Sequence, residues 1–168
     1  MLIHLLRHAI AAPLGEENHF QDEERALTPE GSMKMRKSAQ GLKRLGLTFD
    51  LIASSPLVRA LQTAEIVAEV LKFRKTIELW EELEPDGSIE SVFTRLSGDT
   101  EKASVLLVGH QPSMGYLASC LILGDTKASL PIKKGGIYCV QIDQIPPRDV
   151  GELCWVLPPK MLREIAEL

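Results

Sequence analysis

Short apolar runs alternate with longer amphipathic segments along this chain, and the alternation predicts its elements. Four apolar runs have the length and composition of buried strands, at residues 2–6, 50–53, 76–79 and 104–109. Segments that repeat apolar residues three and four positions apart follow the first, second and fourth of these runs, as in helices that pack on a sheet. Strands that alternate with helices in this way predict a parallel sheet covered by helices on both faces.

Capping residues place the ends of the longer helices. Thr28 has the hydroxyl of an N-cap, Pro29 suits the first helical position, and Gly46 closes the helix after residue 45. By the same argument we expect Ser55 to cap a helix that opens with Pro56 and runs to residue 71. Shorter helices are expected over residues 88–96, 112–123 and 158–168.

The last third of the chain carries two further strand-like segments, at residues 137–142 and 154–157. A turn at Pro146 and Pro147 separates them, so they are expected to pair as an antiparallel edge. The predicted fold is a three-layer α/β/α sandwich with a mostly parallel central sheet and an antiparallel edge. Residues 80–103 are too few for a large cap domain, and without a linker or repeat the whole chain, 1–168, is expected to form a single domain.

Charge and cysteine content limit the possible functions. With 19 basic and 23 acidic residues the formal charge is −4, so a general nucleic-acid binder is not expected and any anion site must be local. The first apolar run is too short for a signal peptide or a membrane span, which predicts a cytoplasmic protein. The cysteines, odd in number and widely spaced, are expected to be buried free thiols: Cys120, Cys139 and Cys154.

Two groups of charged side chains are expected to be merely solvated. One is the basic face of the helix after Thr28, which has no interleaved aromatic residues. The other comprises most of the charged residues of the loop between residues 8 and 27, which contains Glu16, Glu17, His19, Asp22, Glu23, Glu24 and Arg25.

Three junctions between a strand and a helix carry residues that suit a phosphate-like anion. Arg7 and His8 follow the first strand, Arg59 lies in the first turn of the helix after the second, and His110 follows the fourth. Right-handed crossovers bring the carboxyl ends of parallel strands to one edge of the sheet, where ligands bind. Guanidinium groups fix oxyanions, and an imidazole can attack phosphorus or move protons. We therefore expect phosphoryl chemistry at this edge.

The same residues carry a family resemblance. The stretches Leu-Leu-Arg-His-Ala at 5–9, Ser-Ser-Pro-Leu-Val-Arg-Ala-Leu-Gln-Thr-Ala at 54–64 and Val-Gly-His-Gln-Pro at 108–112 resemble three signatures of the histidine phosphatase (phosphoglycerate mutase-like) superfamily. The chain length and the Leu-Thr-Pro-Glu-Gly segment at 27–31 are most similar to phosphohistidine phosphatases of the SixA type. In place of the superfamily's usual Arg-His-Gly triplet this chain has Ala9, so the position cannot require a conformation open only to glycine.

The resemblance implies a role for each matching residue. His8 would be the nucleophile that forms a phosphohistidine intermediate, while Arg7, Arg59 and His110 bind and stabilise the phosphoryl group. His110 would act either as a cation or as a hydrogen-bond donor. Arg25 is a candidate for a further phosphate contact; the alternative is that it is a solvated surface arginine. The acidic proton donor of the superfamily has a candidate in Glu82, with its neighbours Glu81 and Glu84 as rivals.

The leading hypothesis is hydrolysis of phosphohistidine on a protein such as a histidine phosphotransfer domain, by a monomer without metal or cofactor. An imidazole leaves phosphorus more readily than an alkoxide, so a weak proton donor suffices. The alternatives are a phosphatase of small phosphomonoesters and a non-catalytic phosphate-binding regulatory module. His4, His8, His19 and His110 have no metal-ligand spacing, and His4 is expected to point into a packed layer beside its strand.

Overall fold

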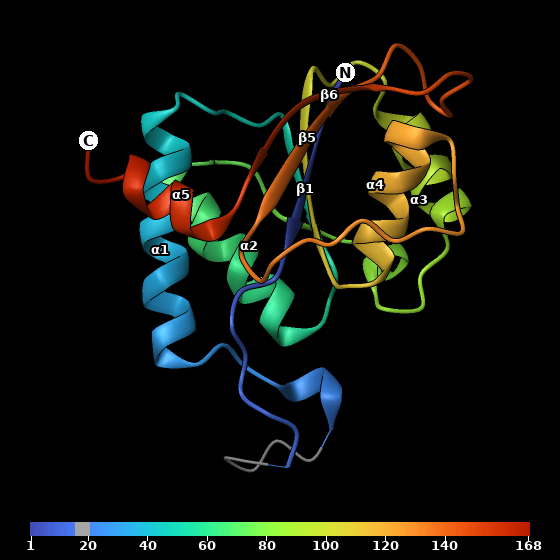
Figure 1. The fold of residues 1–168 in the computed structure, drawn as a ribbon. Coiled ribbons are helices and arrows are strands. Elements are labelled where there is room, and N and C mark those ends of the chain that lie inside the picture. Colours follow the sequence, from blue (N-terminus) through green and yellow to red (C-terminus); the bar gives the residue numbers. More distant parts are fainter. Residues whose placement is uncertain (16–20) are drawn as a thin grey trace.

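The computed structural model describes residues 1–15 and 21–168 and has three layers, a central sheet with helices on both faces (Figure 1). The strands, in the spatial order β3-β2-β4-β1-β5-β6, are β1 (Leu2–Arg7), β2 (Leu51–Ser54), β3 (Glu78–Leu79), β4 (Ser104–Gly109), β5 (Ile137–Gln141) and β6 (Glu152–Leu157). The α-helices are α1 (Pro29–Arg44), α2 (Val58–Leu71), α3 (Ile89–Leu96), α4 (Ser113–Leu123) and α5 (Pro159–Ile165). Three single-turn 3₁₀ helices are η1 (Asp22–Glu24), η2 (Glu81–Leu83) and η3 (Ser97–Asp99). The expected α/β/α sandwich is confirmed.

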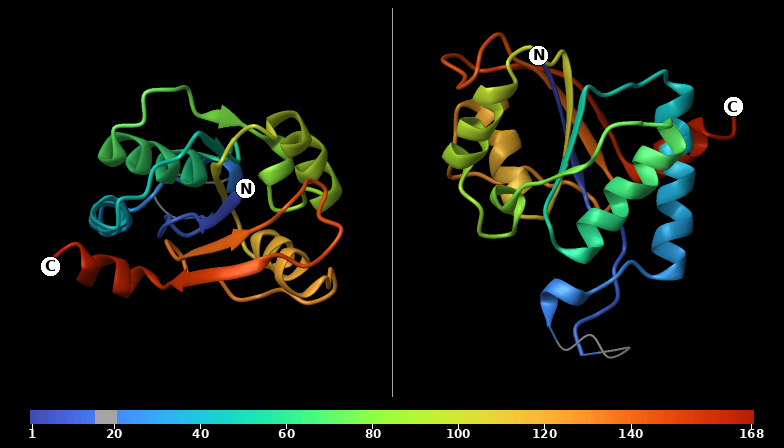
Figure 2. Two further views of the ribbon diagram at one scale, coloured as in Figure 1. Left: turned by 90° about the horizontal axis from the view of Figure 1, so that it is seen from above. Right: turned by 180° about the vertical axis from the view of Figure 1, so that it is seen from behind.

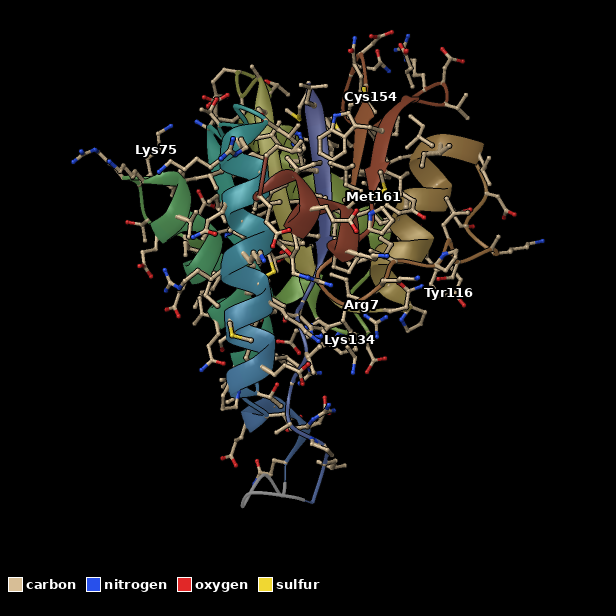
Figure 3. All side chains as sticks on the ribbon, turned by 60° about the vertical axis from the view of Figure 1, so that its left-hand side comes forward. Arg7, Lys75, Tyr116, Lys134, Cys154 and Met161 are labelled. Carbon is tan, nitrogen blue, oxygen red and sulfur yellow. The ribbon has the colours of Figure 1, made fainter. Side chains whose placement is uncertain are left out.

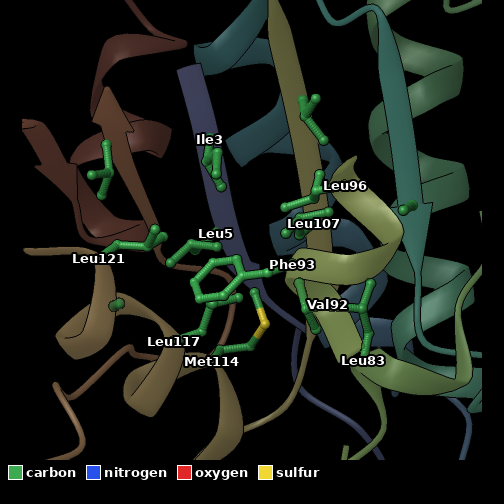
Figure 4. Packing of buried hydrophobic residues seen from close by; sticks show 14 of the residues in the cluster. Ile3, Leu5, Leu83, Val92, Phe93, Leu96, Leu107, Met114, Leu117 and Leu121 are labelled. Atoms are coloured by element: carbon green, nitrogen blue, oxygen red, sulfur yellow. The ribbon is translucent and has the colours of Figure 1, made fainter. Parts of the chain in front are cut away.

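The sheet is parallel through β3, β2, β4 and β1, and antiparallel where β5 pairs with β1 and β6 with β5. Helices α1, α2 and α5 cover one face, and α3 and α4 cover the other (Figure 2). Successive side chains of β1 point to opposite faces. Ile3 and Leu5 therefore pack with Phe93 and Leu117 in one apolar cluster (Figure 4), while Leu6 joins the cluster on the opposite face.

His4 also faces the layer of α1 and α2, as the sequence predicted. Its side chain is 1% exposed, and its ring centroid lies 5.0 Å from that of Phe49 and 5.5 Å from that of Trp155. Burial lowers the pKa of His4 to about 4, so this imidazole is a neutral part of the core.

The register of the parallel strands brings the three predicted junctions to one edge. Arg7 is opposite Gly109 across the β1–β4 pair, and Ser54 is opposite Val108 across the β2–β4 pair. The ladder continues beyond the strands, because the His8 amide donates to the Gly109 carbonyl at 2.9 Å. His8, His110 and the start of α2 therefore share one end of the sheet.

Helix α1 begins and ends where the sequence predicted. The Thr28 hydroxyl accepts a hydrogen bond from the Gly31 amide at 2.9 Å, and Gly46 beyond the helix has a φ of +74°. A Cβ on Gly31 would lie 2.0 Å from the carbonyl oxygen of Ile10, so only glycine lets α1 approach the chain that follows β1 this closely.

Several boundaries differ from those expected, and helix α5 ends at Ile165 instead of residue 168. Helix α2 starts at Val58 with Leu57 as its N-cap, and Ser55 makes a tertiary contact described below. Strand β3 has only two residues, Glu78–Leu79, because its neighbours at 74–76 are exposed. Strand β6 begins at Glu152, two residues early, because it follows β5 in register through a bulge after Cys139.

The prediction of buried thiols is wrong for two of the cysteines. Cys139 on β5 is buried, but Cys120 is half-buried and Cys154 is exposed. Cys154 lies on β6, the edge strand, whose burial pattern is mostly exposed (Figure 3). The basic face of α1 is solvated as expected, and its side chains pair with carboxylates: Lys34 with Glu30, Arg36 with Glu69 and Lys37 with Glu167. The loop residues Glu16, Glu17 and His19 lie outside the described residues.

None of the described helices is long and apolar enough to cross a bilayer.

Candidate active site

His8 occupies the first position after β1, and its surroundings fix the state of its ring. The side chain is 6% exposed, and Nδ1 lies 2.7 Å from the carbonyl oxygen of Ala9. A carbonyl oxygen only accepts hydrogen bonds, so Nδ1 carries the proton and Nε2 carries the lone pair. The ring therefore presents one nitrogen that can act as a nucleophile.

A buried threonine fixes the backbone beside His8. The Ala9 amide donates to the Thr63 hydroxyl at 3.0 Å, and that hydroxyl donates to the Arg59 carbonyl at 2.7 Å, one turn earlier in α2. Ala9 has no left-handed backbone conformation, since Lys72 is the one non-glycine residue with positive φ in the described chain. Alanine is therefore compatible with this position, as the sequence implied.

His110 follows β4 and lies beside His8. Their ring centroids are 5.1 Å apart, and His110 is 2% exposed. Its Nε2 is 2.9 Å from the hydroxyl of Ser55, which also accepts a hydrogen bond from the Leu57 amide at 3.3 Å. Ser55 thus orients His110 instead of capping α2.

Both imidazoles are neutral at physiological pH. Burial lowers the pKa of His8 to about 4; the hydrogen bond to Ala9 opposes this shift, and the positive charges of Arg59, Arg7 and Lys134 add to it. Burial, the neighbouring His8 and Arg59 lower the pKa of His110 to about 3. For His8, desolvation is a larger cause of the lowered pKa than the charges of the neighbouring arginines.

The three candidate arginines converge on this edge of the sheet. Arg7 donates from Nη1 to the Ile132 carbonyl at 2.9 Å. Arg59 is buried and donates from Nη1 to the backbone oxygen of Asp22 and from Nη2 to its carboxylate, both at 2.6 Å. Arg25 donates from Nη1 to the other carboxylate oxygen at 2.6 Å and from Nε to the Ala12 carbonyl at 2.7 Å.

Asp22 therefore bridges two arginines and is not among the merely solvated residues of this loop. Burial raises the pKa of its carboxyl, but the hydrogen bonds from Arg25 and Arg59 outweigh this and hold the pKa below its usual value. The Arg25 contact spans only three residues, but the Arg59 contact spans 37 and could not be foreseen from the loop's composition. An anionic substrate at Arg59 would share this guanidinium with Asp22.

Lys134 is a second residue that sequence reasoning missed. It is exposed, and it precedes Gly135, whose amide donates to the carbonyls of Arg7 and His8 at 3.0 and 3.2 Å. Figure 3 shows Lys134 close to Arg7. Burial and the charges of Arg7, Arg25 and Arg59 lower the pKa of Lys134. The sequence feature that could have indicated Lys134 is its position just before β5, next to Gly135 and Gly136.

The acidic candidates are not connected to this group of residues. Glu82 lies in η2, which passes the end of β4 closely: a Cβ on Gly109 would be 3.1 Å from the Leu83 carbonyl. Within the described residues, however, Glu82 makes no hydrogen bond or ion pair with His8, His110 or the arginines. Its role as a proton donor stays a prediction, as does that of exposed Glu81 or half-buried Glu84.

Clusters of metal ligands and hollows are the features that could mark a further site elsewhere in the described chain. In residues 1–15 and 21–168, no three His, Cys, Asp or Glu side chains are arranged to hold a metal ion. A hollow of about 380 Å³ lies between residues 141–144 and 147–152. Gln141 pairs with Leu2, so this hollow is at the opposite end of β1 from His8.

Comparison with known proteins agrees with the geometry. The family model of the histidine phosphatase superfamily (branch 1) matches residues 3–84. An uncharacterised protein of Picosynechococcus sp. is 37% identical over 82% of this chain and 82% of its own length. The phosphohistidine phosphatase SixA of Escherichia coli is 34% identical over 75% of this chain and 77% of its own.

A solved structure supports the same assignment. The protein histidine phosphatase SixA complexed with tungstate superposes with a TM-score of 0.83 at 30% identity, over 96% of this chain and 99% of that one. The matched residues 3–84 include the junctions after β1 and β2, and the similarity of the fold extends over 96% of the chain. The chain belongs to the histidine phosphatase superfamily.

Proposed function

We propose that this phosphatase hydrolyses phosphohistidine on a protein, and that the phosphoryl group passes through a covalent bond to His8. The observation that carries the proposal is the state of the His8 ring. Its Nδ1 is hydrogen-bonded to the Ala9 carbonyl, and its pKa is lowered to about 4, so Nε2 keeps its lone pair at physiological pH. The ring needs no base to become a nucleophile.

In the first step, Nε2 of His8 attacks phosphorus, a new N–P bond forms, and the N–P bond of the substrate breaks. The electron pair stays on the substrate imidazole, which takes a proton from solvent. In the second step, water attacks the phosphoryl group, the bond to His8 breaks, and inorganic phosphate leaves. One N–P bond replaces another in the first step, so positioning and charge stabilisation are its main requirements.

The cationic groups suit the charge that develops on the phosphoryl oxygens. The guanidinium groups of Arg7 and Arg59 have donors left beyond the hydrogen bonds that hold them. Arg25 would join them by exchanging part of its contact with Asp22 for a phosphoryl oxygen. His110 is neutral in the free protein and would donate a hydrogen bond; a bound dianion would raise its pKa.

Two features favour a phosphohistidine over an ester of an alcohol. No carboxylic acid is hydrogen-bonded to His8 or His110 in the described chain, and an imidazole leaving group, with a pKa of about 6.5, needs less protonation than an alkoxide. Residues 80–103 form η2, α3 and η3 instead of a large cap, which suits access by a folded protein. The expected partner is a histidine phosphotransfer domain.

The similar proteins support this substrate class. One relative is named a phosphohistidine phosphatase, and the solved SixA structure that superposes on this chain contains tungstate, an oxyanion with the tetrahedral shape of phosphate. The chain keeps an arginine or a histidine at each junction where an oxyanion would bind: Arg7, His8, Arg59 and His110.

The proposal is tested by measuring phosphate release, without added metal, from a phosphorylated histidine phosphotransfer domain and from a small aryl phosphate. We expect preference for the phosphoprotein and no turnover by His8→Ala. Because His4 is an equally buried imidazole outside this site, His4→Asn is a matched control that retains activity. Cleavage of the aryl phosphate alone would indicate a phosphomonoesterase, and binding of phosphate without any turnover would indicate a regulatory module.

A further inference from the structure

The turn before β5 is tied to the Arg7–His8 junction at several points. The Gly136 amide donates to the Lys133 carbonyl at 2.7 Å, which closes a turn with Lys134 and Gly135 as its central residues. Gly135 has a φ of +75°, and its amide donates to the carbonyls of both Arg7 and His8. The Arg7 amide in turn donates to the Gly136 carbonyl at 3.2 Å. The backbone of Lys134 is therefore fixed relative to the nucleophile.

The side chain of Lys134 projects from this fixed corner into a region of positive charge. Gly135 and Gly136 are buried, whereas Lys134 is exposed. The charge of Lys134 contributes to the lowered pKa of His8, and the charges of Arg7, Arg25 and Arg59 contribute to the lowered pKa of Lys134. In the described chain, Lys134 forms no ion pair, and the one carboxylate paired with this cluster, Asp22, is held by Arg25 and Arg59. Such a gathering of cations is unfavourable until an anion binds among them.

We propose that Lys134 binds the phosphoryl group of the substrate through its ammonium group, on the β5 side of the site. This inference rests on the proposed function, since it concerns the same phosphoryl group. A phosphoryl dianion offers three oxygens, and a lysine at the rim reaches an oxygen without the planar geometry that an arginine requires. Lys134 is thus a substrate-binding residue that acts equally on the bound substrate and on the transition state.

The experiment compares Lys134→Gln with Lys133→Gln, a matched control. The two lysines are adjacent and exposed in the same turn, and each substitution removes one positive charge. Inorganic phosphate binding is measured by calorimetry, and kcat and KM are measured with the phosphorylated histidine phosphotransfer domain. We expect Lys134→Gln to weaken phosphate binding and raise KM about 5- to 10-fold with kcat nearly unchanged, whereas Lys133→Gln stays within about twofold. Lys134→Arg, which keeps the charge, is expected to restore both values.

Equal phosphate affinity in Lys134→Gln and Lys133→Gln would overturn the inference. A loss in Lys134→Gln that Lys134→Arg does not restore would overturn it as well, since that result indicates a structural role for the side chain. The two proposals can fail separately. If the protein binds phosphate through Lys134 but never hydrolyses phosphohistidine, the proposed function fails alone, and if it turns over without regard to Lys134, this inference fails alone.

Discussion

Replacing Thr63 by valine tests how the fold holds the nucleophile in place. The Thr63 side chain is fully buried, and its hydroxyl links the Ala9 amide to the Arg59 carbonyl. Valine has nearly the same shape, but it can neither accept the first hydrogen bond nor donate the second. The Arg59 carbonyl keeps its helical partner, whereas the buried Ala9 amide loses its acceptor.

The expected cost follows from that unsatisfied amide. A buried donor without a partner costs about 1–3 kcal/mol, and each kcal/mol lowers the melting temperature of a domain of this size by about 2–4 °C. We therefore expect Thr63→Val to melt about 2–12 °C below the wild type. Because Ala9 directly follows His8, we also expect kcat/KM for the phosphoprotein to fall about 10- to 100-fold.

Thr94 provides the matched control. Its hydroxyl also donates to the carbonyl four residues earlier in its helix, that of Glu90 at 2.9 Å, but it is exposed. Thr94→Val should therefore change the unfolding free energy by less than about 0.5 kcal/mol and leave turnover unchanged. Equal melting temperatures of the two valine variants would show that the Ala9 amide does not depend on Thr63. A lower melting temperature with unchanged activity would refute the link to His8 alone.

Further variants and conditions test other parts of the structure. The unfolding free energy should fall as the pH drops from 6.5 towards 4. In this range the histidines of the unfolded state become protonated, whereas the buried imidazoles of His4, His8 and His110 in the folded state stay neutral. At pH 5 the loss is about 2 kcal/mol for His4 alone. Equal free energies of unfolding at neutral pH and at pH 5, measured by urea denaturation, would contradict this expectation. Gly31→Ala should destabilise the protein by more than about 2 kcal/mol, since its Cβ would lie 2.0 Å from the Ile10 carbonyl, whereas Gly98→Ala, with nothing within 4 Å, should not. Equal melting temperatures of these two variants would count against the close approach of α1. Asp22→Asn should bind inorganic phosphate about 3- to 10-fold more tightly in calorimetry, because an anion that competes for Arg59 is removed; weaker binding would show that Asp22 instead orients the arginine.

Much of this architecture could be predicted because the features that determine it are local. The apolar runs of β1 and β4 are clear, and each ends in the residues that matter, Arg7 with His8 and then His110. Parallel strands necessarily deliver their carboxyl ends to one edge, so the approach of the two histidines followed from topology.

The contacts that orient these side chains could not be predicted in the same way. The Ser-Pro sequence at 55–56 has the local pattern of a helix cap, but the Ser55 hydroxyl contacts His110, 55 residues away. The ion pair of Asp22 with Arg59 depends on where a long loop folds back over α2. Lys134 reaches the site because β5 joins the sheet beside β1, and neither that pairing nor its register can be read from periodicity.

The most direct test of the covalent pathway is to trap the phosphorylated enzyme. The protein is mixed with a phosphorylated histidine phosphotransfer domain, quenched in alkali within milliseconds, digested and analysed by mass spectrometry. We expect a phosphoryl group on the peptide that contains His8, absent from His8→Ala and lost on the time scale of phosphate release. Phosphate release by the wild type with no phosphorylated His8 at any time, together with turnover by His8→Ala, would contradict it.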